Sequence, residues 1–475
     1  MIVNNLSETL SNNINVIIIG SGPAGISTAI KLEKNKIKSL ILEAGGIEQP
    51  SDASDYLKGE VKGDEYPELS SLRLRQFGGT SGLWGGSCNP FREEDLDEWP
   101  IKLKDLNEYS LEAKEILNLK EKFYDEKFSK NLKIYNLNWS NVRFGEKYFE
   151  HIKKSKYISL SLNTAFLNFN GKSKTIDSVT CFKNDKFYNL KANYYVLSCG
   201  GIENSRLMLW SKERNKTLFN YKLPIGKYYM NHPYYSIGEG LVVYNKYNKY
   251  FLNNNILNKP LITCKRRIHI SADKNFIKKK NILNSGIYLN LEVSWKYNSL
   301  FKQIRCVAPR YFKEIYEKIK AKEVYQITIN TLQEQRPEEQ NSISLSNNFD
   351  PLNMPLSKIY WKRSLSEIKS AKIIAEELGG VFLDNDIGRI ALNDYLYGET
   401  GEYDVITGNH QLGGTRMGYS ESDSVVDKNL KVHDVENLYI NGSSVFRTGG
   451  HNHPTYTIVK LSLRLGDHLK NLKIT

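Results

Sequence analysis

Apolar residues follow two different periods at the N-terminal end of the chain. Residues 14–19 form a short β-branched run, and residues 39–42 form a second apolar run that ends in Glu43. The intervening residues 24–34 carry apolar side chains at helical spacing. Buried parallel strands appear in sequences as continuous apolar runs, so the pattern predicts a strand, a helix and a second strand of a doubly wound α/β domain.

Similar patterns recur further along the chain. Strand-like runs occupy residues 161–169, 178–183, 194–198, 234–243, 285–293 and 326–332. Helical spacing is found over residues 203–211 and again after Pro454, where an apolar stripe marks a buried side. Residues 300–322 have an amphipathic, basic helical pattern. We interpret that pattern as a solvated helix on a sheet rather than as a lid or a membrane-surface contact.

A glycine-rich turn joins the first strand to the first helix, with the pattern G-x-G-x-x-G over Gly20, Ser21, Gly22, Pro23, Ala24 and Gly25. Its glycines permit a tight turn, close approach of a pyrophosphate and close packing of helix on strand. The helix N-terminus then faces the phosphates. Glu43 is expected to accept hydrogen bonds from a ribose 2′-hydroxyl, which disfavours NADP. The motif predicts a dinucleotide site without separating NAD from FAD.

A second glycine-rich segment lies between residues 73 and 90. Its glycines exclude a regular helix or strand, yet Trp84 stands in the middle of the segment. Close backbone approach beside an aromatic wall suits a flat ring system, which favours a flavin over a simple phosphate site. A third piece of the same domain is expected at residues 194–211, where a strand is followed by Cys199, Gly200 and a helix.

Two histidine motifs occupy the C-terminal end of the chain. His410 stands in residues 409–418, and His453 stands just before Pro454 in residues 441–455. Imidazoles are suited to taking a proton from an alcohol near neutral pH, and a dinucleotide cofactor can take the accompanying hydride. Pro454 suits the first turn of a helix, whose positive end would face a reduced flavin. His433 and His468 are interpreted as structural residues.

Composition and charge narrow the class of protein. The net charge is +13, but Lys, Asn, Ile and Tyr are abundant throughout and no long basic arm accompanies the charge, so nucleic acid binding is not expected. Five scattered cysteines without a CxxC pair indicate reduced thiols and no metal site. No signal peptide or membrane span is expected. We predict a cytoplasmic enzyme for which peripheral membrane contact stays open.

At this point the sequence resembles the glucose–methanol–choline (GMC) oxidoreductases, a family of FAD enzymes. The resemblance rests on residues 20–25 with Glu43, on residues 78–90 and 196–209, and on nearly everything from His410 to residue 469. Residues 226–233 also resemble the family's crossing into its substrate domain. The resemblance implies hydride transfer from an alcohol, expected to be a sugar or sugar derivative, to flavin N5. His410 is then the general base, and His453 orients the substrate oxygen.

The resemblance also implies a set of binding residues. Those expected at the cofactor are Gly20, Ser21, Gly22, Pro23, Ala24, Gly25, Glu43, Ala44, Gly78, Gly79, Thr80, Ser81, Trp84, Gly85, Gly86, Ala165, Cys199, Gly200, Asn204, Gly442, Ser443, Pro454 and Thr455. Those expected at the substrate are His451, Asn452 and Arg447.

Two positions depart from the family's pattern. Relatives that attach FAD covalently use a histidine where this chain has Leu83, so FAD is expected to bind noncovalently. The family's usual proline after a Val-Phe pair is replaced by Arg447. That arginine can bind an anionic substrate group or pair with an acidic side chain, and the sequence leaves both readings open.

Length and motif positions predict a two-part organisation. At 475 residues the chain exceeds a single compact core. We expect an FAD-binding domain from residues 1–235 and 405–475, with an α+β substrate domain containing an antiparallel sheet inserted at 236–404. Two rival functions remain, an NAD(P)H-linked reductase or monooxygenase and a flavoprotein with no redox role. The sequence identifies neither the alcohol nor the electron acceptor.

Overall fold

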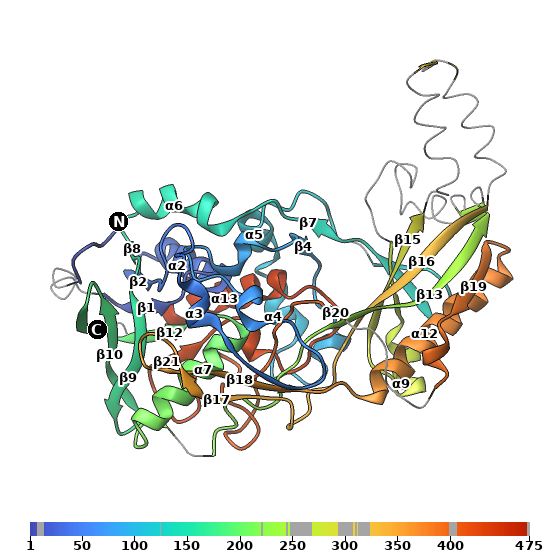
Figure 1. Ribbon diagram of the computed structural model, residues 1–475. Coiled ribbons are helices and arrows are strands. Elements are labelled where there is room, and N and C mark those ends of the chain that lie inside the picture. Colours follow the sequence, from blue (N-terminus) through green and yellow to red (C-terminus); the bar gives the residue numbers. More distant parts are fainter. Residues whose placement is uncertain are drawn as a thin grey trace.

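The computed structural model describes residues 1–6, 14–123, 125–219, 222–243, 246–247, 268–292, 307–308, 311, 324–398 and 406–472. Figure 1 shows two parts side by side, a nucleotide-binding part that contains both termini and a second part built around long antiparallel strands. The helix expected over residues 300–322 lies outside the described residues, apart from Val307, Ala308 and Tyr311.

A five-stranded parallel sheet forms the centre of the first part. Its order is β21 (Leu438–Ile440), β12 (Tyr194–Leu197), β1 (Val16–Ile19), β2 (Ser39–Leu42) and β8 (Ile158–Ser161). Neighbouring strands are all parallel. Helices α2 (Pro23–Lys34) and α13 (Thr455–Lys470) pack against each other, and α7 (Gly201–Arg214) follows β12. The expected doubly wound fold is confirmed.

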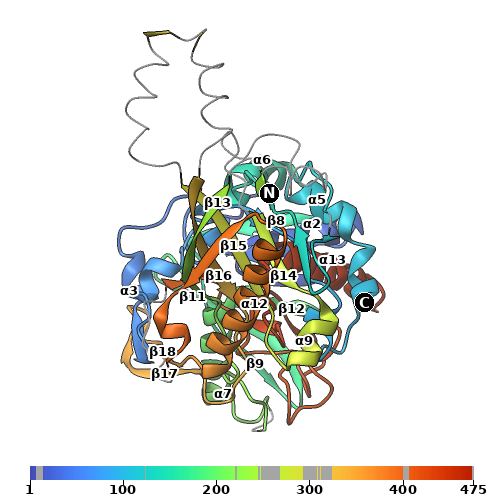
Figure 2. The same ribbon diagram turned by 90° about the vertical axis from the view of Figure 1, so that its right-hand side faces the viewer.

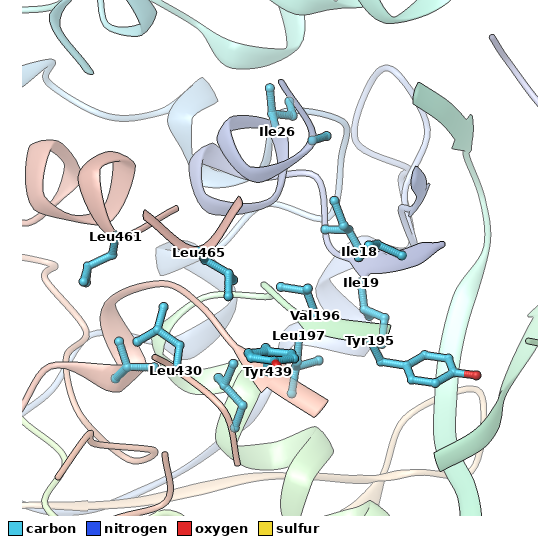
Figure 3. Packing of buried hydrophobic residues seen from close by; sticks show 14 of the residues in the cluster. Ile18, Ile19, Ile26, Tyr195, Val196, Leu197, Leu430, Tyr439, Leu461 and Leu465 are labelled. Atoms are coloured by element: carbon cyan, nitrogen blue, oxygen red, sulfur yellow. The ribbon is translucent and has the colours of Figure 1, made fainter. Parts of the chain in front are cut away.

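Apolar side chains from both ends of the chain fill the core of this part. Ile18 and Ile26 come from the N-terminal unit, whereas Leu461 and Leu465 come from the last helix, and all four are less than 2% exposed. Figure 3 shows these side chains together with those of β12 and β21 in one packed cluster. The C-terminal helix is therefore an integral part of the nucleotide-binding core.

The order of the parallel sheet creates a crevice where the chain reverses direction. β1 lies between β2, which follows it in the chain, and β12, which comes much later. In such sheets ligands bind at the carboxyl ends of the two strands beside the reversal. Gly20 follows β1 with a φ of +97°, and a Cβ there would overlap the carbonyl of Ser198. Only glycine allows this close passage of the two loops.

The second part contains an eight-stranded sheet. Along it lie β19 (Gly388–Leu392), β13 (Pro233–Val243), β16 (Val324–Gln333), β15 (Ser285–Glu292), β14 (Ile268–Ala272), β6 (Leu132–Tyr135) and β5 (Asp125–Lys127), and β20 (Ile406–Thr407) pairs with β13. All its pairings are antiparallel. The expected antiparallel sheet is present.

Helix α12 (Leu365–Asp384) covers one face of this sheet, as Figure 2 shows. The alternation of strand side chains explains the two faces. On β15, Ile287 and Leu289 pack into a core with α12, whereas Tyr288 belongs to a separate cluster with Leu332 and Leu137. The face away from α12 is therefore the one available to a ligand.

Smaller elements complete the fold. They are α3 (Ala53–Leu57), β3 (Gly59–Gly63), β4 (Ser87–Cys88), α4 (Leu103–Asn107), α5 (Ser110–Ile116), β7 (Asn138–Trp139), α6 (Phe144–Lys154), β9 (Ala165–Lys172), β10 (Thr175–Lys183), β11 (Lys186–Leu190), α9 (Lys274–Lys280), β17 (Ser342–Phe349) and β18 (Pro355–Trp361). Strands β9, β10 and β11 form one three-stranded sheet, and β17, β18 and β3 form another.

Two segments lie across the domain boundaries expected from the sequence. Strands β5 and β6, from the N-terminal third, join the antiparallel sheet of the second part. Strand β18 pairs with β3, and β17 and β18 both contact α7 of the nucleotide-binding part. Each part therefore includes strands from the sequence range expected for the other part. The chain passes between the two parts more than twice.

Candidate active site

A cavity of about 1300 Å³ runs from the glycine-rich turn to the antiparallel sheet. Pockets for drug-sized ligands measure roughly 300–1,000 Å³, so this cavity exceeds what one small molecule needs. Its walls come from the 20–24 turn, the second glycine-rich segment, the loop after β12, the two histidine motifs and β13, β15 and β16. A cofactor and a substrate can therefore share it.

The N-termini of three helices line the cavity. The residues at the starts of α2, α7 and α13 are Gly22, Gly200 and Pro454, and all three line the cavity. No described side chain caps the first turn of any of these helices. Helix N-termini carry partial positive charge and unpaired N–H groups, so this arrangement favours an anionic ligand.

Three glycines keep the cavity open. A Cβ added at Gly22, Gly85 or Gly200 would meet no described atom within 4 Å, apart from its immediate chain neighbours. All three residues line the cavity. Each Cβ would therefore occupy space that a ligand can use, as expected of glycines that let a cofactor approach the backbone.

Most of the residues expected at the cofactor line this cavity. They are Gly20, Ser21, Gly22, Pro23, Ala24, Glu43, Ala44, Gly79, Thr80, Ser81, Trp84, Gly85, Gly86, Ala165, Cys199, Gly200, Gly442, Ser443, Pro454 and Thr455. Trp84 donates from Nε1 to the carbonyl of Val142 over 2.9 Å, which fixes its ring in the wall. Leu83, in contrast, is 61% exposed and is not among the lining residues.

Three of the expected cofactor residues do not line the cavity, and each has a packing role instead. A Cβ on Gly25 would lie 2.0 Å from the carbonyl oxygen of Gly20, so Gly25 allows the turn to close on the helix. Gly78 has a φ of +90° and donates its N–H to Ser21 Oγ over 3.2 Å. Asn204 accepts from the N–H of Cys199 and donates to the 441–444 segment. These residues shape the loops that line the cavity.

Glu43 holds the glycine-rich turn in place. Its Oε2 accepts hydrogen bonds from the N–H of Ser21 at 3.1 Å and from Ser21 Oγ at 2.5 Å, and its Oε1 accepts from Gly45 N–H at 2.9 Å. Burial raises the pKa of the Glu43 carboxyl above its ordinary value. A carboxylate has about four acceptor sites, so one remains for a ligand hydroxyl.

The two motif histidines meet in the wall of the cavity. The ring centroids of His410 and His453 lie 5.1 Å apart, and both residues line the cavity. The backbone N–H of His410 donates to Asn231 Oδ1 over 3.0 Å. The backbone N–H of His453 donates to Asn89 Oδ1 over 2.9 Å, and its Nδ1 lies 3.3 Å from the same oxygen. Motifs 43 residues apart in sequence thus form one pair of imidazoles.

A third histidine, His232, stands behind His410. The two Nδ1 atoms are 2.8 Å apart, and His232 Nε2 lies 3.2 Å from the carbonyl oxygen of Gly449. His232 is fully buried, and burial lowers its pKa to about 3. Burial, with the neighbouring imidazoles, also lowers the pKa of His410 well below its ordinary value. Both rings are therefore neutral near pH 7.

A buried polar cluster supports the loop that carries His453. Asp95 accepts from Asn452 Nδ2 at 2.8 Å and from Asn284 Nδ2 at 3.0 Å, and Asn452 also bonds Asn89. Glu334 accepts from the N–H groups of Asn284 and Gly450. Burial, with repulsion from Glu94, raises the pKa of Asp95 to about 6, and burial, with repulsion from Asp95, raises the pKa of Glu334 to about 7.

This cluster corrects the expected roles of His451 and Asn452. Both are fully buried, and neither is among the lining residues of the cavity. His451 Nε2 bonds the hydroxyl of Tyr135, which also lies 2.8 Å from His269 Nε2. Their side chains point into the supporting cluster, so the prediction that they contact the substrate is wrong. The sequence does not reveal that the loop turns away from the cavity between 449 and 452.

Arg447 is also corrected by its contacts. Its Nη1 donates to Asp423 Oδ2 over 2.6 Å, and it is not among the residues that line the cavity. Arg416 donates to the same carboxylate over 2.7 Å. Of the two readings left open by the sequence, pairing with an acid is the one observed. Arg447 is not available for an anionic substrate.

The raised carboxyl pKa values predict how stability depends on pH. A buried carboxyl that is protonated in the folded state contributes stability below its ordinary pKa of 4.5, and this contribution is lost as the pH rises through about 7. Thermal denaturation should therefore show a smaller fall in Tm from pH 5 to pH 8 for Glu334→Gln than for the parent. The exposed Glu146→Gln should keep the parent's slope. An unchanged slope in the Glu334 variant would contradict the assignment.

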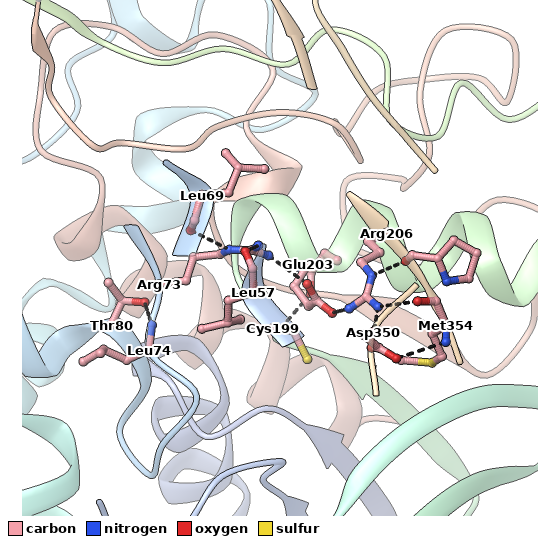
Figure 4. A network of polar contacts seen from close by, with 12 residues as sticks. Leu57, Leu69, Arg73, Leu74, Thr80, Cys199, Glu203, Arg206, Asp350 and Met354 are labelled. Carbon is pink, nitrogen blue, oxygen red and sulfur yellow. Dashed lines mark hydrogen bonds and ion pairs between the residues drawn. The ribbon is translucent and has the colours of Figure 1, made fainter. Parts of the chain in front are cut away.

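A buried ion-pair network lines the nucleotide end of the cavity (Figure 4). Arg206 donates to Asp350 Oδ2 at 2.6 Å and to Glu203 Oε1 at 2.7 Å. Arg73 donates to Glu203 Oε2 at 2.9 Å and to the carbonyl of Leu57 at 2.6 Å. The network ties α7 to the segment before the second glycine-rich loop and to the turn between β17 and β18.

The opposite end of the cavity differs in charge. The lining residues contributed by the antiparallel sheet and by residues 137–139 are Leu137, Trp139, Tyr234, Tyr288, Leu289, Asn290, Leu332 and Thr407. None of these described residues carries a formal charge. Aromatic rings beside one amide and phenolic hydroxyls suit a neutral molecule that offers apolar faces and hydroxyl groups.

Several residues of the site were not identified from the sequence. His232 and Asn231 belong to the 226–233 motif, which was interpreted only as a crossing between domains. Asn89 lies near the end of the second glycine-rich segment, for which the sequence predicted a role of the backbone and of Trp84 only. Asp95 and Glu334 have no local signal, because an isolated acidic residue looks like a surface position until its burial is known.

Comparison with known proteins supports the family resemblance. The sequence model of the GMC oxidoreductases matches residues 337–462. The 2-methyl-1,2-propanediol dehydrogenase of Mycolicibacterium austroafricanum is 24% identical over 59% of this chain and 48% of its own length. The fructose dehydrogenase large subunit of Gluconobacter japonicus is 29% identical over 34% of this chain and 28% of its own length. The chain thus spans half or less of the length of these curated relatives.

Solved structures share the fold. Pyridoxine 4-oxidase from Mesorbium loti aligns with a TM-score of 0.56 at 13% identity, covering 96% of this chain and 99% of that one. A formate oxidase aligns with a TM-score of 0.57 at 14% identity, covering 96% and 98%. The family model, which matches residues 337–462, confirms the resemblance indicated by the sequence motifs. Among the described helices, none is long and apolar enough to cross a membrane.

Proposed function

We propose that this protein is an FAD-dependent oxidoreductase that oxidises a neutral alcohol, such as a sugar or sugar derivative, to a carbonyl compound. One observation carries the proposal. A single cavity is lined both by a dinucleotide-binding turn and by two imidazoles whose centroids are 5.1 Å apart. The names of the relatives, a diol dehydrogenase and a fructose dehydrogenase, support alcohol oxidation.

The residues at the nucleotide end fit FAD. The uncapped start of α2 and the open space over Gly22 suit a pyrophosphate, and the remaining acceptor site on Glu43 suits a ribose hydroxyl. Trp84, Gly85 and Gly86 offer a wall for a flat ring. The start of α13 favours negative charge beside Pro454. Bound FAD would supply a hydride acceptor.

The two histidines have different roles toward the substrate. His410 takes the hydroxyl proton while the carbon loses its hydride, so that the C–O single bond becomes a carbonyl. His453 holds the substrate oxygen in the orientation that this transfer requires. The uncharged aromatic wall of Tyr234 and Tyr288 binds the carbon skeleton and excludes water.

The proposal predicts which compounds will reduce the bound flavin. Under anaerobic conditions, at least one of fructose, 2-methyl-1,2-propanediol and pyridoxine should bleach the visible flavin absorbance of the FAD-loaded protein. Formate, an anion, should not, because the substrate end of the cavity carries no formal charge to pair with it. Bleaching by NADH alone, with all alcohols inactive, would favour the reductase reading instead.

We further propose that FAD is held noncovalently. The exposed Leu83 offers no nucleophile at the position where some relatives carry the attaching histidine. Acid precipitation should leave all the flavin in the supernatant, measured by its absorbance. Flavin that remains on the precipitated polypeptide would overturn this reading.

A further inference from the structure

The contact between His232 and His410 constrains where the protons sit. A backbone carbonyl can only accept a hydrogen bond, so the 3.2 Å contact from His232 Nε2 to Gly449 requires a proton on Nε2. The buried His232 is neutral, as its lowered pKa of about 3 indicates. Its Nδ1 therefore carries a lone pair and can only accept.

The same reasoning fixes the position of the proton on His410. Its Nδ1 lies 2.8 Å from the Nδ1 of His232, and a hydrogen bond between them needs one donor. Because His232 Nδ1 is the acceptor, His410 Nδ1 must carry the proton. His410 is neutral as well, so its Nε2 is left with a lone pair. A general base needs such an unprotonated nitrogen to accept a proton.

The residues around His232 hold the two imidazole rings in this hydrogen-bonded arrangement. Its ring is fully buried, and Asn231 Oδ1 accepts the backbone N–H groups of both His232 and His410, at 2.8 and 3.0 Å. A Cβ at Gly449 would lie 3.0 Å from His232 Nε2, so glycine allows the carbonyl-bearing loop to come this close. No carboxylate hydrogen-bonds either ring among the described residues, and the nearby titratable group is His453.

We propose that His232 is a positioning residue that fixes the tautomer of His410, so that Nε2 of His410 is the bare nitrogen facing the substrate. The inference rests on the proposed function, in which His410 is the base. An imidazole thus takes the place that a carboxylate or carbonyl usually takes behind a catalytic histidine. In this chain of hydrogen bonds, His410 Nδ1–H donates to His232 Nδ1, and His232 Nε2–H donates to the Gly449 carbonyl.

The tautomer can be measured without any substrate. Nitrogen-15 labelling of histidine in the FAD-loaded protein, with the His410 and His232 signals assigned from Ala variants, reports which ring nitrogen carries each proton. We expect a protonated Nδ1 and bare Nε2 on His410, and the opposite on His232. A protonated Nε2 on neutral His410 would overturn the proposal.

Two isosteric variants separate the donor and acceptor functions of His232. His232→Asn places Oδ1 near the position of the ring Nδ1, so it can still accept from His410. His232→Gln places its amide N–H near the position of Nε2, so it keeps the contact with Gly449 and loses the acceptor. The Gln variant should show a mixed or reversed His410 tautomer, whereas the Asn variant should keep the parental one.

The same pair should differ in rate. With fructose or 2-methyl-1,2-propanediol, flavin reduction should fall about 10–100-fold in His232→Gln at saturating substrate, and only a few-fold in His232→Asn. Both variants should retain FAD and the parental KM. Equal losses in the two variants, or no loss in His232→Gln, would overturn the inference. If His410→Ala itself reduced flavin normally, the proposed base would fail and not merely its positioning.

Discussion

His410→Ala should slow reduction of the bound flavin by an alcohol about 10²–10⁴-fold, because removing a general base typically costs this much. The variant should still hold FAD, since His410 is separate in the cavity wall from the glycine-rich turn and the start of α2, where we propose that the pyrophosphate binds. Stopped-flow absorbance under anaerobic conditions measures the rate, and the flavin-to-protein absorbance ratio measures occupancy. A variant that reduces its flavin at the parental rate would defeat the mechanism.

Variants of two other histidines test whether the loss is specific to the active site. His453→Asn should be milder than His453→Ala, because an amide can still hydrogen-bond the substrate oxygen. His433 serves as the control. Its Nε2 bonds Ser424 Oγ at 2.9 Å, and it does not line the cavity. His433→Ala should therefore leave the reduction rate nearly unchanged. A loss in the control as large as that in His410→Ala would indicate a general structural effect.

The backbone features of the site could be predicted from the sequence, because glycines and strand patterns act locally. The turn at residues 20–25, the strand before it and the helix after it have the expected bounds within two residues. The meeting of His410 and His453 came from the family resemblance, since nothing local joins residues so far apart. Their 5.1 Å separation depends on the parallel sheet that brings both chain ends together.

The direction of individual side chains could not be predicted in the 447–453 loop. Five polar or charged residues flank Gly449 and Gly450 in this loop, and their composition alone suits either a cavity wall or a buried support. The outcome depends on partners supplied by segments that are distant in the sequence. Tyr135 from β6 binds His451, and Asp95 binds Asn452. Such pairings are tertiary, so local patterns carry no signal for them.

Arg206→Met should lower the free energy of unfolding by about 3–5 kcal/mol, because it leaves a buried carboxylate without its cation. The side chains of Arg206 and Asp350 are only 4% and 1% exposed, and their atoms lie 2.6 Å apart. Urea denaturation of the FAD-loaded protein, followed by tryptophan fluorescence, measures the change. Lys227→Met is the matched control. It breaks the Lys227–Glu339 pair, whose side chains are 49% and 58% exposed, and should lower the free energy of unfolding far less than Arg206→Met does.

A second substitution at Asp350 tests whether the unpaired charge is the cause. Asn at this position can still accept from the N–H groups of Leu352 and Met354, which Asp350 Oδ1 receives at 2.8 and 3.0 Å. The double variant Arg206→Met, Asp350→Asn removes both charges, so it should be more stable than the sum of the two single losses predicts. Strict additivity would mean that Arg206 stabilises the fold mainly through its contacts with Glu203 and the carbonyl of Pro355. In either case the loss should weaken FAD binding, because the network forms part of the cavity wall at the nucleotide end.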